Sequence, residues 1–494
     1  YCLPDDYEVM DSSLDDIKYC LQPSFKNTEL SALEQSETLS RDVSGVVYLP
    51  GFVGMNNINN ADYVNSALHA LAHVKPIRDF FLVPANYTQS RSSLVHAFGE
   101  IMRKLWSRGN FKSTVSPVGF VHEVNVLSKG RFAGGQKAVV VDFLSWLLTA
   151  LHKGLVALPP RTSAAGSTKK RPRPSSSSFS TLLQSSIIHD TFQGLIRVDS
   201  LKEGANEEGQ ETMSSVEVPC MHLTLNLPTL SLFKGGDQEK GVPSIPEVQL
   251  YELLKKMDGE TWTTTPTRDK GFTKKRYTLR KLPRFLIFNV ERFTKTQFAL
   301  EKNPTIVNFP VKNLNMKPYL ALDDGDDSES CATTVEDLKD MDNGALRKVI
   351  ASWGAHSKKI QHMAVTALER SDLEAAARTA LEARSSAAKY DLVASICHDS
   401  STHKAVARKV ASDATGTSAG TSGSAASQAN INTNNNYGGD TSVLEEGAFK
   451  THLHHKSTNQ WFELQDLHVT ETMPQLVGLS ESTLLFYALH SENE

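Results

Sequence analysis

The residues best suited to chemistry in this chain are a cysteine and a group of histidines. Cys397 directly precedes His398, and further along the chain stand His452, His454 and His455. A thiol beside an imidazole base can act as a nucleophile, and histidines that alternate along a strand share one face and could bind a metal. No cysteine or second carboxylate stands at ligand spacing from these histidines, which weighs against a metal site. Cys397 ends an apolar strand pattern, so we expect a small buried thiol.

The five cysteines are scattered along the sequence, at Cys2, Cys20, Cys220, Cys331 and Cys397. None forms the C-x-x-C pair that is typical of a structural zinc site, so we expect no metal or other cofactor within this sequence. Scattered single cysteines are also typical of a protein in a reducing compartment.

An acidic residue, Asp62, opens the clearest helical pattern of the sequence. Small and apolar residues follow it at three- and four-residue spacing, at Tyr63, Ser66, Ala67, Ala70, Leu71 and Val74. We expect Pro76 to stop this helix. A cysteine at a helix N-terminus would have its pKa lowered by the free backbone amides and the helix dipole. Asp62 has no thiol, so we expect it only to cap the helix.

Further helices and a series of strands must position these residues. The helical pattern recurs at 95–106 and 141–152, which predicts a helical lobe. A short strand is expected at 46–51. Aromatic and β-branched runs predict more strands at 192–198, 221–227, 284–290, 305–309, 390–396, 448–452, 461–464 and 483–489. Helices followed by strands in this order predict an α+β protein.

Three segments interrupt the pattern. The first and the last contain too little apolar surface to form a core, whereas the middle one opens with an acidic patch at 323–327 and is expected to form helices from Leu346 to Ala383. We interpret them as insertions at about 160–180, at 322–389 and at 401–443. The first contains a short basic run at 169–173, which could be a nuclear-localisation signal or a solvated linker. Because no aromatic residue interrupts this run, it indicates direct RNA contact only weakly.

Composition excludes some broad classes of function. The chain of 494 residues is 39% hydrophobic, with a net charge of −4 and a pI near 6.5. Its overall charge gives no reason to expect attraction to nucleic acid or to an anionic membrane. No run of about eighteen consecutive apolar residues predicts a membrane helix, so we expect no membrane partner.

Short boxes along the chain resemble, in order, those of the ubiquitin-specific protease family. Residues 54–68 have the frame of its cysteine box, G-L-x-N-L-G-N-T-C-Y-M-N-S-x-L, and 282–293 are similar to its L-P-x-x-L-x-x-x-L-K-R-F strand. Other similar segments are Gln136 with 142–148, 192–194, 308–310, 390–392 and 461–466. The resemblance implies a papain-like α+β fold with a helical, thumb-like lobe and an antiparallel β lobe that forms palm and fingers.

The same resemblance assigns each catalytic role to a position. Active members of the family use a Cys-His-Asp/Asn triad and an asparagine that stabilises the oxyanion. Matched to the motifs, the cysteine falls at Asp62, the histidine at Ala448 and the orienting acid at Gln465, whereas Asn57 keeps the oxyanion asparagine. Asn57 is equally well explained as a turn residue. With nucleophile, base and orienting acid all substituted, we expect a pseudo-protease, not an enzyme.

One branch of the family carries N-N-I-x-x-N-D-Y in place of the cysteine box, and residues 56–63 are similar to it. That branch is the ubiquitin-protease-like splicing factor of the spliceosomal tri-snRNP. The resemblance implies a nuclear scaffold that contacts tri-snRNP proteins and supports tri-snRNP assembly or stability. It also implies that 46–494 form the protease-like domain, and that 1–45 are the tail and linker of a zinc-finger ubiquitin-binding-type domain whose zinc ligands lie upstream.

Two alternatives stay open at this point. The first is an active deubiquitinase, a thiol-dependent ubiquitinyl hydrolase, which would need another cysteine and histidine within bonding reach in the cleft between the lobes. The second is a ubiquitin receptor without hydrolysis, which would keep a weak contact with ubiquitin or a ubiquitin-like protein.

Overall fold

The computed structural model describes most of the protease-like region and part of its N-terminal side. The described residues are 23–33, 37–156, 185–202, 212–228, 246–266, 272–295, 300–320, 346, 370–386, 388–400, 444 and 447–490. The insertions expected at 160–180 and 401–443 lie outside them, as do most of 322–389 and about half of 1–45. The domain limits and the zinc-finger tail therefore stay predictions.

The helical lobe is the first part of the fold. Its described helices are α3 (Asp62–Ala72), α4 (Lys75–Leu82), α5 (Ser93–Trp106), α6 (Val118–Leu127), α7 (Val140–Leu155) and α8 (Ile187–Phe192). The helices expected at 95–106 and 141–152 are confirmed as α5 and α7. The role given to Pro76 is wrong, because α3 ends at Ala72 and Pro76 lies in the first turn of α4. A helix can accept proline there, since the backbone N–H groups of that turn have no partner within the helix.

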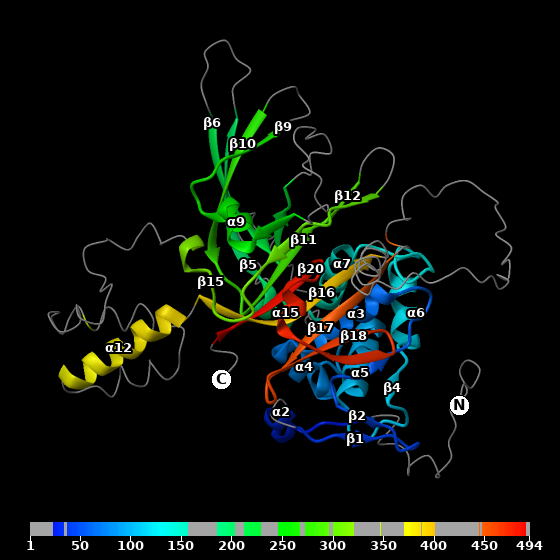
Figure 1. Cartoon of the computed structure of the whole chain (residues 1–494). Helices are drawn as coiled ribbons and strands as arrows, with labels where there is room; N and C mark the ends of the chain where they lie inside the picture. The colour runs from blue at the N-terminus through cyan, green and yellow to red at the C-terminus, as the bar shows by residue number, and fades with distance from the viewer. Residues whose placement is uncertain are drawn as a thin grey trace, which may run out of the picture.

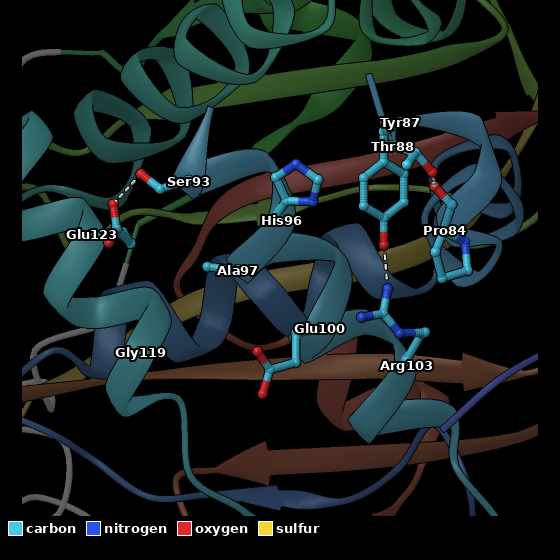
Figure 2. Close-up of a pocket in the computed structure, with 10 residues that line it drawn as sticks. All are labelled: Pro84, Tyr87, Thr88, Ser93, His96, Ala97, Glu100, Arg103, Gly119 and Glu123. Carbon is cyan, nitrogen blue, oxygen red and sulfur yellow. Dashed lines mark hydrogen bonds between the residues drawn. The ribbon is translucent and has the colours of Figure 1, made fainter. Parts of the chain in front are cut away.

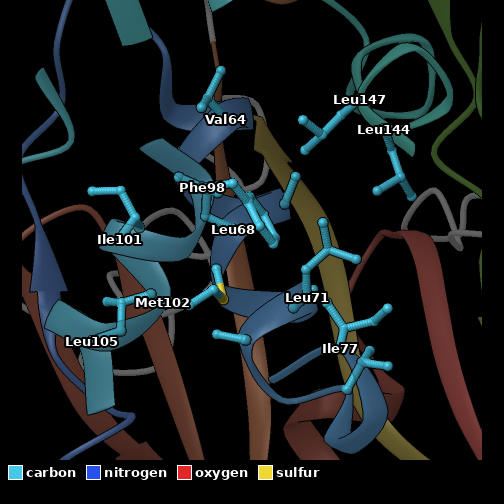
Figure 3. Packing of buried hydrophobic residues seen from close by; sticks show 14 of the residues in the cluster. Val64, Leu68, Leu71, Ile77, Phe98, Ile101, Met102, Leu105, Leu144 and Leu147 are labelled. Carbon is cyan, nitrogen blue, oxygen red and sulfur yellow. The ribbon is translucent and has the colours of Figure 1, made fainter. Parts of the chain in front are cut away.

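Helix α3 lies at the centre of this lobe, and all of its residues are buried. Figure 3 shows Leu68 and Leu71 of α3 between the apolar side chains of α5, such as Phe98 and Met102, and those of α7, such as Leu144. Burying one such side chain stabilises the fold by roughly 1.5–3 kcal/mol. The start of α3 is therefore held in place by packing on several sides.

The large sheet provides the other half of the site. Its strand order is β19-β18-β17-β16-β20-β11-β7, and the short strand β15 pairs with β16. The bounds are β7 Leu223–Asn226, β11 Phe285–Glu291, β15 Leu314–Asn315, β16 Lys389–Ser400, β17 Gly447–His455, β18 Gln460–Gln465, β19 His468–Thr472 and β20 Ser482–Leu489. Neighbouring strands are antiparallel except β7 and β11, which are parallel. Figure 1 shows the blue and cyan helices gathered beside this sheet.

A second, four-stranded antiparallel sheet projects away from the helical lobe (Figure 1). It contains β5 (Gly194–Lys202), β6 (Thr212–Cys220), β9 (Thr263–Pro266) and β10 (Phe272–Lys281). Asp199 lies near its middle and accepts hydrogen bonds from Arg197, Ser215 and Arg276. The strand expected at 192–198 begins at Gly194, because Phe192 still belongs to α8.

Short elements and one longer helix, α12, complete the described fold. They are α2 (Asn27–Leu33), β1 (Ser40–Arg41), β2 (Val47–Tyr48), β3 (Gly54–Met55), η2 (Pro84–Asn86), β4 (Thr114–Val115), β8 (Glu247–Gln249), α9 (Leu250–Leu254), η3 (Lys255–Met257), β12 (Phe293–Lys295), β13 (Leu300–Lys302), β14 (Ile306–Asn308), η4 (Lys317–Tyr319), α12 (Arg370–Ser386) and α15 (Pro474–Gly478). Of the helices in the described part of the chain, none is both long and apolar enough to cross a membrane.

Candidate functional site

Asp62 is the first residue of α3, and its side chain is buried. Its Oδ2 accepts a hydrogen bond from Lys137 Nζ at 2.9 Å and another from Phe449 N at 3.1 Å. Burial raises the pKa of this carboxyl, while Lys137 and the backbone amide of Phe449 act to lower it. The expected cap is only partly met: Ala61 is the N-cap residue, but Asp62 Oδ1 accepts a hydrogen bond from Tyr63 N at 2.9 Å at the start of the helix. Its Oδ2 bonds instead to a lysine and to strand β17.

Lys137 completes this arrangement, although no pattern in the sequence points to it. Its Nζ also donates a hydrogen bond to Gly447 O at 2.6 Å. Lys137 and Asp62 thus bind the backbone on either side of Ala448, at Gly447 and at Phe449. The structure therefore brings Asp62 and Ala448 together, as the motif match expects, and a buried ion pair joins α3 to β17 at that point.

Asn57 lies in the loop before α3 and is bound to the turn after β18. Its Nδ2 donates a hydrogen bond to Asp466 Oδ2 at 3.0 Å, and Asn65 Nδ2 donates one to Asp466 Oδ1 at 3.0 Å. Asp466 has a φ of 50°, in the left-handed region that aspartate tolerates in turns. Asp466 therefore ties the loop of Asn57 to helix α3 through Asn65.

Gln465 ends β18 and borders an open hollow of about 570 Å³ together with Asn57. The other residues that line this hollow are Asn56, Ile58, Asp466, Leu467 and His468. Neither Asp62 nor Ala448 is among them. The position of Asp62 is filled by its ion pair, whereas Asn57 and Gln465 lie at a surface that a partner can reach.

Away from Asp62, three strands bring a thiol, an imidazole and a carboxylate into a row. Cys397 Sγ lies 3.8 Å from His452 Nδ1, and His452 Nε2 lies 3.0 Å from Glu463 Oε2. Lys450 Nζ lies 3.1 Å from the same carboxylate oxygen. A cysteine and a carboxylate that do not stand at ligand spacing in the sequence come to lie beside His452, because β16, β17 and β18 pair side by side.

The charges in this row stabilise one another. Burial lowers the pKa of His452, but the larger effect of Cys397 and Glu463 raises this pKa above its usual value, to about 9. The hydrogen bond from His452 lowers the pKa of Glu463 to about 2, with a further contribution from Lys450. At neutral pH the pair is therefore an imidazolium and a carboxylate.

The position of this row argues against cleavage of a protein substrate. Cys397 and His452 are each only 1% exposed, which confirms the expected buried thiol. Thr451 points toward α3, since its Oγ1 donates a hydrogen bond to Ser66 O at 3.2 Å. Its neighbour His452 points to the opposite face of the sheet, because side chains alternate along a strand. The thiol is thus enclosed on the face turned away from α3, where a folded substrate does not reach it.

The remaining candidate histidines do not join this row. His398 is buried on the other face, with Nε2 3.4 Å from Leu444 O, and its ring packs against Phe449. His454 Nε2 lies 3.1 Å from Asn459 Oδ1, and His455 contacts Thr458. Across the part of the chain that is described, no three histidine, cysteine or acidic side chains gather as a metal site.

A second hollow, of about 410 Å³, opens on the helical lobe between η2, α5 and α6. Figure 2 shows two pairs of its polar side chains bound to each other: Arg103 donates to the hydroxyl of Tyr87, and Ser93 to the carboxylate of Glu123. None of the residues singled out from the sequence lines it, so we assign it no role in the site.

Comparison with known proteins places the chain in a family. The model of the family described as "Ubiquitin carboxyl-terminal hydrolase" matches residues 53–405. The chain belongs to this family. "Ubiquitin carboxyl-terminal hydrolase 39" of Mus musculus is 34% identical to it, over 100% of this chain and 69% of the mouse protein.

One further relative and one solved structure have descriptions from RNA splicing. "Probable mRNA-splicing protein ubp10" of Schizosaccharomyces pombe is 31% identical, over 98% of this chain and 73% of its own length. A solved structure described as "Crystal structure of an essential yeast splicing factor" covers 99% of this chain and 82% of its own, with 18% identity and a TM-score of 0.54. The expected α+β fold of ubiquitin-specific proteases, with its helical and β lobes, is confirmed.

Proposed function

We propose that this chain is a non-catalytic member of its family that serves pre-mRNA splicing as a scaffold. In this proposal it acts in the nucleus, contacts proteins of the spliceosomal tri-snRNP and supports tri-snRNP assembly or stability. The ion pair between Asp62 and Lys137 carries the proposal. The name of its relative in fission yeast, a probable mRNA-splicing protein, supports the splicing role.

The chemistry of the ion pair explains why no cleavage is expected. A cysteine protease needs a thiolate, an imidazole that takes up its proton and a group that orients the imidazole. Asp62 offers a carboxylate already bonded to an ammonium and an amide. Ala448 has no titratable group and Gln465 no charge, so the three positions lack the chemistry of acyl transfer even though Asn57 is retained.

An active-site probe tests the absence of cleavage. The purified chain is incubated with ubiquitin that carries an electrophile at its C-terminus, beside an active ubiquitin-specific protease as positive control. We expect no covalent adduct, because the candidate thiol at Cys397 is enclosed. An adduct that disappears in Cys397→Ser would overturn the proposal in favour of the deubiquitinase alternative, and one that persists would point to a different thiol.

Depletion of the protein tests the scaffold role. We expect the tri-snRNP to fall apart into smaller particles on a gradient, and expression of the wild-type chain to restore it. Cys397→Ser should restore it equally well, because no thiol chemistry is required. A tri-snRNP that stays intact after depletion would count against the scaffold role, whatever the result with the ubiquitin probe.

The open hollow beside Asn57 favours a second candidate, a weak contact with ubiquitin or a ubiquitin-like protein. Leu467 in this hollow is 49% exposed, and Asn57 and Gln465 offer amide groups beside it. Titration with isotope-labelled ubiquitin, followed by NMR, would detect such a contact. We expect small shifts that Leu467→Asp abolishes. Unchanged spectra would exclude ubiquitin itself as the partner.

A further inference from the structure

Cys397 occupies an irregular place in the large sheet. The pairing of β16 with β20 shifts register between Ile396 and Cys397, whereas on the other side Cys397 pairs directly with Lys450. Cys397 Sγ lies 3.7 Å from Lys450 O and 3.8 Å from the ring of His452. Such irregularities re-aim side chains, and they recur beside reactive sites.

Three cationic side chains are close enough to Cys397 to interact with a charge on its sulfur: Arg292, Lys450 and His452. Arg292 is fully buried, and its Nη2 has no hydrogen-bond partner among the residues that are described. Positive charge beside a thiol favours the thiolate, which is the reactive form.

We propose that Cys397 is an oxidation-sensitive thiol, and that His452 assists its reaction with a hydroperoxide such as hydrogen peroxide. The thiolate attacks one peroxide oxygen, so that an S–O bond forms and the O–O bond breaks. Sulfur is oxidised to sulfenic acid, and the peroxide is reduced. The leaving hydroxide takes the proton of the His452 imidazolium and departs as water. Glu463, bonded to the far nitrogen of the ring, is a positioning residue that keeps this proton available.

We expect the surroundings of the Cys397 thiol to admit only small reagents. Cys397 and His452 are 1% exposed, but the side chains of Glu463 and Lys450 in front of them are 29% and 18% exposed. Within this row, solvent reaches Lys450 and Glu463 but hardly the sulfur. We expect a molecule little larger than water to reach the thiol past these two side chains, whereas a polypeptide cannot. This inference does not rest on the proposed scaffold role.

Cys220 provides an internal control in the same chain. It is more exposed than Cys397, but burial raises the pKa of its thiol to about 11. The full chain at pH 7 is exposed to hydrogen peroxide with dimedone, and sulfenic acid is quantified at each cysteine by mass spectrometry. We expect Cys397 to be labelled at least about tenfold faster than Cys220. Equal or slower labelling of Cys397 would overturn the proposal.

Variants of His452 and Glu463 distinguish a role in proton supply from simple shielding of the Cys397 thiol. If His452 and Glu463 only covered the thiol, His452→Gln and Glu463→Gln would loosen the cover and raise the rate. If they supply and hold the proton, both variants should lower the rate by about tenfold or more. Thr451→Val is the matched control, because Thr451 lies between Lys450 and His452 but faces α3, and its rate should stay unchanged. A rate that rises in both Gln variants would contradict the proposal.

Discussion

A cysteine protease needs reactive groups and an accessible place for its substrate at one site. In this chain the start of α3 and the paired strands β16, β17 and β18 each provide only one of the two. At the start of α3, Asp62 and Lys137 form an ion pair near an open hollow, with no thiol or imidazole bound to the carboxylate. On the strands, Cys397 and His452 stand in contact but are enclosed. The comparison teaches that reactive groups and an accessible place for a substrate are separate requirements, and each region meets one of them.

The largest expected effect comes from breaking the ion pair in the first region. Asp62→Ala leaves the ammonium of Lys137, whose side chain is 13% exposed, without its carboxylate. Loss of one partner of a buried pair costs about 3–5 kcal/mol of unfolding free energy. Urea unfolding of Asp62→Ala, Lys137→Met and the double variant measures this cost. We expect the double variant to lose less than the sum of the two single variants. Simple additivity would show that the two charges do not depend on each other.

The second prediction concerns pH and the other region. The pKa of His452 is raised from 6.5 to about 9, so its contribution to stability is fully present below pH 6.5 and is lost as the pH rises through 9. The size is on the order of 3 kcal/mol. Unfolding measured from pH 6 to pH 10 should show a decline that His452→Gln removes. The same decline in both proteins would assign it to other groups.

A smaller effect separates the thiol from the rest of its row. Cys397→Val keeps a buried apolar volume, so we expect a change in unfolding free energy of less than about 1.5 kcal/mol. The pKa of His452, followed by NMR, should fall because the sulfur no longer raises it, but Glu463 should keep it above its usual value. A pKa unaffected by Cys397→Val would mean that the imidazole and the thiol are independent.

The smallest effect is expected at the retained oxyanion asparagine. Asn57 is exposed, and its hydrogen bond to Asp466 is worth roughly 0.5–1.5 kcal/mol. Asn65→Ala is the matched comparison, since Asn65 is 2% exposed and binds the same carboxylate. We expect Asn57→Ala to destabilise the fold less than Asn65→Ala in thermal unfolding. A larger loss of stability in Asn57→Ala than in Asn65→Ala would show that Asn57 contributes more to the fold than its exposure predicts.

Much of the fold follows from periodicity in the sequence. Helices α5 and α7 and strands β11, β16 and β20 have clear apolar patterns, and each was expected within a few residues. Strand β10 was missed because polar and charged residues dominate it, as in Lys274, Lys275 and Arg276. Strand β6 was missed because serines, a glutamate and a proline interrupt its apolar residues. Pro76 was expected to stop α3 but lies in the first turn of α4, since a proline near the end of one helix can equally lie at the start of the next.

The site was predictable only where a local motif carries it. The frame of 54–68 located Asp62 and Asn57. Lys137 lies in a loop with no pattern of its own, and only the folded chain places its ammonium against Asp62. The contact of Cys397 with His452 depends on the register of strands that are far apart in the sequence, which no local spacing encodes.

The complete burial of α3 has a consequence for how such chains are recognised. Each side chain of this helix touches neighbours in the lobe or the sheet, so most substitutions along it would leave a gap or a clash. Packing alone is enough to preserve the residue types around position 62, whatever residue stands at that position. A sequence profile that scores this stretch therefore reports how well its residues fit the space around the helix. Its score carries no information about catalytic activity.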